Sequence, residues 1–215
     1  MSGRLVAWLS FVGIQILLAY SVRASQGKPE RNAVYHYDLA VSAVVQYGIF
    51  LVVVVAIAGV GNVRAALALR RPRSWRRAAG AAAVVLAGIV VLNALLDPIL
   101  HAGREQGLTP TSWQPSHAGA FAASFAAVTL VGPFVEEAAF RGLGFSLLAP
   151  YGTPTAIAVV GLLFGLAHGL VDGLPVLVAF GAGLAWIRAR TDSLYPPLLV
   201  HALFNAVALV VAVTA

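Results

Sequence analysis

Long apolar runs separated by short polar stretches form the main pattern of this chain. A membrane-spanning helix needs about 20 mostly apolar residues, and seven segments approach or exceed that length. They are residues 5–22, 39–63, 78–100, 118–148, 155–170, 174–187 and 194–215. The pattern therefore predicts an all-α protein, a polytopic transmembrane helical bundle of about seven helices.

The fourth segment, residues 118–148, is longer than one perpendicular crossing of a bilayer requires. Such a helix is tilted, is broken near Gly132–Pro133, or projects from the membrane. Division into two crossings would give eight helices and would move Arg188 and Arg190 to the other side. We therefore expect one long helix.

Positive charge gathers in two places between the apolar runs. Six of the fourteen basic residues lie between Arg64 and Arg77, and Arg188 and Arg190 follow the sixth run. Seven alternating crossings put both clusters on one side, as the positive-inside rule requires, with the N-terminus in the cytoplasm. The net charge of +6 thus indicates contact with membrane lipids and not with nucleic acid.

Composition supports the membrane assignment and excludes some chemistry. The chain is 60% hydrophobic and 10% charged, whereas soluble domains average about 25% charged residues. The absence of cysteine excludes disulfides, thiol catalysis and cysteine-ligated zinc. Residues 1–24 fit a retained helix better than a signal peptide because the apolar stretch is long. The abundance of Arg and Ala suits a bacterial plasma-membrane protein.

Three ionisable residues interrupt the fourth apolar run: Glu136, Glu137 and Arg141. Charges at membrane depth are costly, so each is a functional-site hypothesis. Glu137 and Arg141 are four residues apart, share a helix face and can pair. Glu136 lies about 100° round the helix and is left to face a cavity or another helix. The cluster thus divides into a structural pair and a working carboxylate.

Two later helices carry further polar groups. Phe164 and His168 are four residues apart, and so are His201 and Asn205, so each pair shares a helix face. A single histidine in a helix usually serves packing. Two of them together with Glu136, in a chain with eight acidic residues, favour one shared site.

The residues leave two chemistries open. Glu136 and His168 could activate a water while His201 and Asn205 donate to the oxyanion of an amide. Alternatively, Glu136, His168 and His201 could hold a divalent metal such as zinc with an open water position. No local His-Glu-x-x-His motif is present, and Ser146 lacks a nucleophile-elbow context.

The ordered set Glu-Glu-x-x-x-Arg, Phe-x-x-x-His and His-x-x-x-Asn resembles the CPBP family. That family contains CAAX prenyl proteases and bacteriocin-processing intramembrane proteases, also called Abi proteins. The resemblance covers roughly residues 118–210. It divides the chain into residues 1–117, N-terminal transmembrane helices with a basic loop, and residues 118–215, a catalytic helical core.

The resemblance implies an intramembrane endopeptidase that acts on a membrane-associated protein or peptide, with prenylated CAAX-type substrates in some relatives. Glu136 and His168 would activate the water, and His201 and Asn205 would hold the oxyanion. Glu137, Arg141 and Phe164 would support them. Family members are described both as metalloproteases and as metal-free glutamate proteases. The resemblance therefore fixes neither the cofactor, nor the substrate, nor an oligomeric state.

Two other functions fit the same residues. A non-enzymatic membrane protein of the same fold, such as an immunity factor or scaffold, would keep the helices without the chemistry. A proton-coupled transporter would use Glu136 and the histidines as a relay. The sequence shows no inverted repeat, which counts against the transporter.

Overall fold

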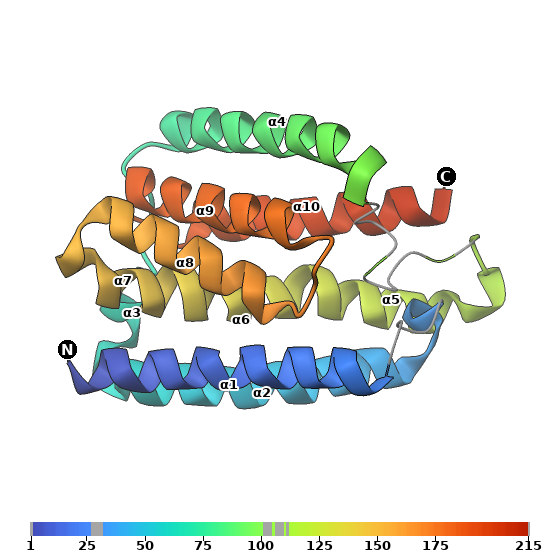
Figure 1. Ribbon diagram of the computed structural model, residues 1–215, viewed down its shortest axis with the longest axis horizontal. Helices are drawn as coiled ribbons and strands as arrows, with labels where there is room; N and C mark the ends of the chain where they lie inside the picture. Colours follow the sequence, from blue (N-terminus) through green and yellow to red (C-terminus); the bar gives the residue numbers. More distant parts are fainter. Residues whose placement is uncertain (1, 27–31, 101–104, 106–109, 111, 215) are drawn as a thin grey trace.

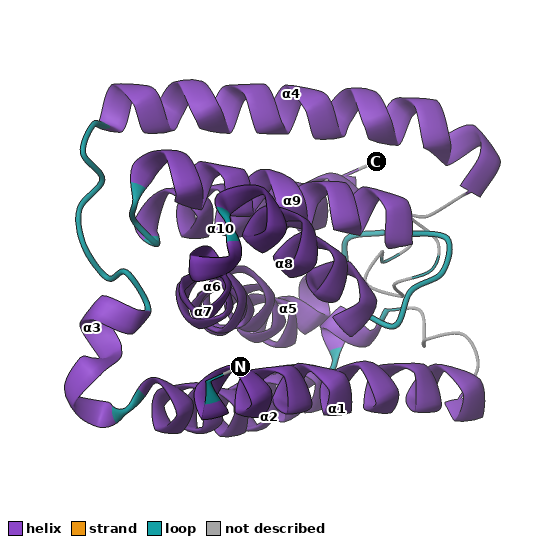
Figure 2. Ribbon diagram, turned by 60° about the vertical axis from the view of Figure 1, so that its left-hand side comes forward, coloured by secondary structure: helices purple, strands orange, loops and turns teal. Residues whose placement is uncertain are grey.

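The computed structural model describes residues 2–26, 32–100, 105, 110 and 112–214, and these residues are mainly helical with no strand. Figures 1 and 2 show three layers. Helices α1 and α2 form one outer layer, α4 forms the other, and the remaining long helices lie between them. The predicted all-helical bundle is confirmed.

Within the described residues, seven long helical segments correspond to the seven predicted runs. They are α1 (Gly3–Gln26), α2 (Tyr37–Ala58), α4 (Trp75–Leu100), the continuous segment Pro115–Tyr151, α8 (Thr153–Ala167), α9 (Leu174–Thr191) and α10 (Tyr195–Thr214). Among the described residues, five of these are long and apolar enough to cross a membrane, the exceptions being α8 and α9. Large apolar side chains on the outer helices, such as Leu17, Val52 and Ile99, are exposed, as lipid-facing side chains would be. The chain is an integral membrane protein.

Helix α1 packs into the core of the bundle. Leu5, Trp8 and Val12 are buried, and the Trp8 indole N–H donates to the carbonyl oxygen of Ala139 at 2.9 Å. The Trp8 ring also fills the space beside Gly144, where a Cβ would lie 2.2 Å from it. The first helix is thus joined directly to the helix that carries the acidic pair.

The long fourth segment is one helix without a break at Gly132–Pro133. It runs through α5 (Ala118–Ala126), a π-helical turn (Ala127–Val131), α6 (Gly132–Glu137), a second π-helical stretch (Ala138–Gly144) and α7 (Phe145–Leu148). Proline lacks the N–H that would complete the helical ladder. A π-helical turn is wider than an α-helical turn, and the one directly before Pro133 accommodates the missing hydrogen bond. The helix therefore continues through Pro133 and does not break there.

Small residues bring α8 and α9 into close contact. A Cβ on Gly161 would lie 2.7 Å from the backbone nitrogen of Ala182, and a Cβ on Gly181 would lie 2.9 Å from the carbonyl oxygen of Gly161. Backbone atoms line both positions, so neither can give way. This close approach suits helix packing in a membrane and places the end of α8 beside the centre of the bundle.

Several predicted helix boundaries, among them the ends of α2, α8 and α9, were wrong by a few residues. Helix α2 ends before Gly59, which has φ of +77°, and a short helix α3 (Val63–Ala66) follows. Helix α8 stops at Ala167 because Gly169 adopts φ of +65°. Helix α9 continues through Arg188 and Arg190 to Thr191, beyond its predicted end at residue 187. Cations are favourable in a last helical turn.

The two basic clusters lie at the same end of the bundle, as predicted. Arg70 donates to the side-chain and backbone oxygens of Asp192, at 2.5 and 2.8 Å. Arg188 donates to the same Asp192 carboxylate at 3.0 Å. Burial alone would raise the pKa of Asp192, but the hydrogen bonds and charges of Arg70 and Arg188 outweigh it and lower the pKa.

Glu105 ties together segments at the opposite end. Its side chain is 7% exposed, pairs with Arg23 in the last turn of α1, and accepts from the backbone N–H groups of Val171 and Gly173, each at 2.8 Å. Burial alone would raise the pKa of Glu105. The two backbone hydrogen bonds and the Arg23 charge outweigh burial, so its pKa lies below the usual value.

Candidate active site

Glu136 and Glu137 are adjacent on α6 but have different surroundings. The Glu136 side chain is 18% exposed, whereas that of Glu137 is fully buried. Neighbouring residues on a helix point about 100° apart, which explains the difference. Only Glu136 is accessible to a substrate or a water from outside.

Tyr47 on α2 fixes one oxygen of Glu136. Its hydroxyl donates to Oε1 at 2.5 Å. The ring passes beside Gly132, where a Cβ would lie 3.1 Å from it. Since Oε1 is held by Tyr47, Oε2 is the oxygen that faces the two histidines.

Glu137 and Arg141 form the predicted pair inside the bundle. Arg141 donates to Glu137 Oε1 at 2.8 Å and to the carbonyl oxygen of Gly181 at 2.9 Å, and both side chains are fully buried. The guanidinium also lies 4.1 Å above the Phe164 ring. Arg141 therefore ties its own helix to α8 and α9.

His168 is held at the end of α8 by its own helix. Its Nδ1 lies 2.8 Å from the carbonyl oxygen of Phe164, and its ring packs on the Phe164 ring with centroids 4.6 Å apart. A carbonyl only accepts hydrogen bonds, so Nδ1 carries the proton. In the neutral imidazole, Nε2 is then an acceptor, and it lies 4.0 Å from Glu136 Oε2.

His201 on α10 is held by the buried carboxylate. Its Nδ1 lies 2.9 Å from Glu137 Oε1, the oxygen that also binds Arg141. Because a carboxylate accepts, Nδ1 again carries the proton. Its Nε2 lies 3.7 Å from Glu136 Oε2. The ring packs edge-on against Phe164 and Phe180.

Three acceptor atoms thus converge: Oε2 of Glu136 and the Nε2 atoms of His168 and His201. Separations of 3.7 and 4.0 Å are too long for direct hydrogen bonds. When both imidazoles are neutral, none of these three atoms carries a proton. The arrangement suits a bound donor such as a water, or a cation.

The donor set also matches the kinds of ligand in His₂Glu metal sites. The Nδ1 of each histidine is bound to a carbonyl or carboxylate oxygen. Metal-ligating histidines usually donate their second ring N–H to such an oxygen. Zinc requires all ligands about 2.0–2.2 Å from one point. Within the described ranges no three His or acidic residues are grouped closely enough to hold a metal ion. The metal set Glu136, His168 and His201 stays a prediction.

Asn205 lies one turn beyond His201 on α10. Its amide nitrogen donates to the carbonyl oxygen of Val128 at 3.0 Å, in the π-helical turn that precedes α6. That bond uses one of the two amide hydrogens. Asn205 is therefore placed beside the long helix with one N–H to spare, and it is joined to Val128 rather than to Glu136.

Sequence reasoning missed Tyr47. It assigned no site residue to the first three helices, yet Tyr47 binds the exposed carboxylate from α2. One feature of the sequence could have indicated Tyr47: Gln46 and Tyr47 place polar groups in the middle of an apolar run. Their partner could not be read from the sequence because 89 residues separate Tyr47 from Glu136.

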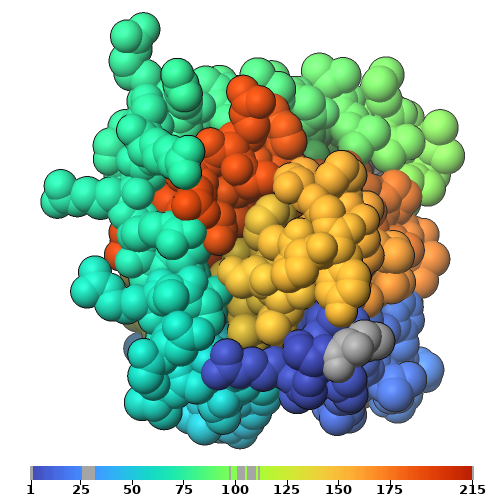
Figure 3. Space-filling view, turned by 90° about the vertical axis from the view of Figure 1, so that its left-hand side faces the viewer, coloured from blue at the N-terminus to red at the C-terminus, as the bar shows by residue number. Residues whose placement is uncertain are grey.

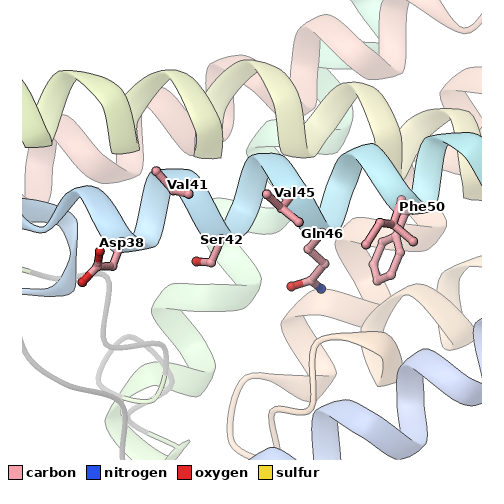
Figure 4. Close-up of a pocket in the computed structure, with 7 residues that line it drawn as sticks. Asp38, Val41, Ser42, Val45, Gln46 and Phe50 are labelled. Carbon is pink, nitrogen blue, oxygen red and sulfur yellow. The ribbon is translucent and has the colours of Figure 1, made fainter.

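Helix α2 also lines a cavity of about 420 Å³. Figure 4 shows Asp38, Ser42 and Gln46 at four-residue spacing along the helix, with Phe50 further on. None of the converging acid and imidazole groups lines this cavity. The candidate site is therefore defined by the contacts around Glu136 and not by this hollow.

A family model matches the C-terminal part of the chain. Residues 118–207 match the family model described as type II CAAX prenyl endopeptidase Rce1-like. Searches of curated proteins and of solved structures found no match. The matched region holds every site residue named from the sequence, and Tyr47 lies outside it. This region is therefore similar to the Rce1-like type II CAAX prenyl endopeptidases, consistent with the predicted resemblance to the CPBP family.

Proposed function

We propose that this protein is an intramembrane endopeptidase that hydrolyses a peptide bond of a membrane-associated protein or peptide. The observation that carries the proposal is the convergence of Glu136 Oε2 with the Nε2 atoms of His168 and His201. The Rce1-like match supports the same activity.

The three acceptors suit a nucleophilic water. A water between them donates one hydrogen to Glu136 Oε2 and the other to a histidine Nε2, which leaves its lone pairs facing the substrate. Glu136 takes the proton as the water oxygen attacks the carbonyl carbon. The same proton then passes to the amide nitrogen as the C–N bond breaks, giving an amine and a carboxylic acid that keeps the second hydrogen of the water.

The developing oxyanion needs donors. Asn205 has one amide hydrogen beyond the bond to Val128 and can supply it. His201 can donate from Nε2 only as an imidazolium, because Nδ1–H already binds Glu137. In this mechanism His201 therefore helps to hold the oxyanion only while its imidazole carries both protons.

The substrate class we propose follows from the family. A CAAX-type substrate is a membrane-associated chain whose prenylated cysteine lies near its C-terminus. The reconstituted protein should cut a C-terminal peptide that carries a prenyl group faster than the same peptide without it. Equal rates on both peptides would reject this substrate class and leave the endopeptidase proposal standing.

The deciding experiment compares the termini of membrane proteins in cells with wild-type protein and in cells with Glu136→Gln. We expect new termini with the wild type that are absent with the variant. Asp172→Asn, the same acid-to-amide change at an exposed position, should keep them. Identical termini in all three would favour the non-enzymatic scaffold or immunity factor.

Metal dependence is tested separately on the purified protein. Loss of cleavage in a chelator and recovery on addition of zinc would assign Glu136, His168 and His201 as ligands. Cleavage that persists in the chelator would assign the water activation to Glu136 with His168.

The proposed location is a bacterial plasma membrane, with the Arg64–Arg77 loop and the N-terminus in the cytoplasm. Since the chain has no cysteine, single cysteines at Ser74 and Ser112 can be labelled from outside the cell. Only the second should react with an impermeant reagent. Labelling of the first would reverse the orientation.

A further inference from the structure

A cavity of about 500 Å³ lies at the basic end of the bundle. Three parts of the chain form its walls: the loop before α4, the segment from α7 to the start of α8, and the end of α9. Figure 3 shows this end, where the teal loop region, the gold α7–α8 region and the orange-red region around the end of α9 meet. The cavity is separate from the site around Glu136.

Positive charge exceeds negative charge in its lining. Four arginines, Arg70, Arg73, Arg188 and Arg190, face one carboxylate, that of Asp192. Asp192 is already bound by Arg70 and Arg188. The cavity therefore has a surplus of guanidinium groups that Asp192 cannot neutralise, and it favours an anion.

The Arg188 side chain is held in place in the wall of the cavity. Its side chain is 6% exposed and lies 5.2 Å above the Phe145 ring. Its Nε is buried and has no hydrogen-bond partner among the described residues. A buried N–H without an acceptor is costly, and an anion in the adjacent cavity would stabilise the charge of this guanidinium.

Arg73 and Arg190 also line the cavity, and their side chains are free to change conformation. Both side chains are exposed, and Arg190 rests over the Trp186 ring at 5.6 Å. Two hydroxyls, those of Ser146 and Thr153, also line the cavity and can donate. Planar guanidinium forks together with hydroxyls match the oxygens of a phosphate group.

We propose that this cavity binds a phosphate group, presented by an anionic lipid headgroup or as free phosphate. The expected occupant is lipid, since the cavity lies at the end of membrane-spanning helices, where headgroup phosphates are found. The site is independent of the proposed peptidase chemistry, since no residue around Glu136 contributes to it.

The test is native mass spectrometry of the full chain in detergent with phosphatidylglycerol or phosphatidylcholine of the same acyl chains. We expect one phosphatidylglycerol to bind saturably and more tightly than phosphatidylcholine. Arg73→Gln with Arg190→Gln should weaken that binding about tenfold or more. Arg76→Gln with Arg77→Gln removes the same charge from the same end without touching the cavity lining, and should leave the affinity unchanged.

Inorganic phosphate separates the two sources. Displacement of phosphatidylglycerol by phosphate means that free phosphate occupies the site, and no displacement means that the lipid is the ligand. Equal loss of affinity in both double variants would overturn the proposal, because binding would then depend on overall charge. Preference for neither lipid, with no phosphate binding, would overturn it as well.

Discussion

The Tyr47 hydroxyl donates to Oε1 of Glu136 at 2.5 Å and joins α2 to the long fourth helix. This contact leaves Oε2 as the oxygen that faces the two histidines. It also means that a residue outside the family-matched region, residues 118–207, takes part in the candidate site. Tyr47 is thus a positioning residue for the proposed base.

Replacement of Tyr47 by Phe should lower kcat/KM about tenfold or more, since a hydrogen bond to a charged group contributes about 1.5–3 kcal/mol. The ring stays beside Gly132, so packing is retained. The measurement is peptide cleavage by the purified protein, together with thermal unfolding. Tyr37→Phe, on the same helix at an exposed position, should leave cleavage unchanged. Full activity in Tyr47→Phe would remove Tyr47 from the site.

Replacement of Glu137 by Gln should destabilise the protein strongly. It leaves the Arg141 charge buried without its partner, a loss of about 3–5 kcal/mol in other buried pairs. Arg70→Gln breaks a more exposed pair with Asp192 and should cost about 1 kcal/mol or less. Thermal unfolding in detergent measures both. Similar losses in the two variants would contradict a structural role for the buried pair.

Replacement of Gly161 by Ala should separate α8 from α9. The new Cβ would meet the backbone of Ala182 at 2.7 Å, and overpacking of this kind costs about 1–3 kcal/mol. Gly80→Ala is the matched control, because a Cβ there meets nothing within 4 Å and alanine is the better helix former. We expect a lower unfolding temperature for the first variant and an equal or higher one for the second. A tolerated Gly161→Ala would mean that the two helices pack less closely.

Stability should fall on acidification in part through Glu105. Its pKa is lowered in the folded protein, so its contribution is fully present above the unfolded-state pKa and is lost as pH falls through the folded-state pKa. Glu105→Gln should therefore be less stable than the wild type at neutral pH, and the difference should shrink in acid. Unfolding temperatures across this pH range measure it. Asp38→Asn, an exposed acid, serves as control; a wild-type advantage over Glu105→Gln that persists in acid would contradict the assignment.

The helices were predictable from the sequence because apolar length is a local property. The pairing of Glu137 with Arg141 and the contact of Phe164 with His168 were predictable for the same reason, since each pair lies within one helix. The shared location of the two basic clusters followed from the alternation of crossings.

Contacts between distant helices could not be predicted. Tyr47 reaches Glu136 and Asn205 reaches Val128 only through the packing of separate helices. The π-helical turns at Ala127–Val131 and Ala138–Gly144 have no simple sequence signature, because a π-turn is set by how its neighbours pack. The protonated nitrogen of each histidine likewise follows from an acceptor that only the fold supplies.

One oxygen, Oε1 of Glu137, binds both Arg141 and His201. Integrity of the bundle and orientation of the imidazole thus depend on a single carboxylate. A related protein without the proposed peptidase activity could carry another residue in place of Glu136. It would still need Glu137 in order to fold. Pseudoenzymes of this architecture should therefore be recognised by a changed first glutamate beside an unchanged second glutamate and arginine.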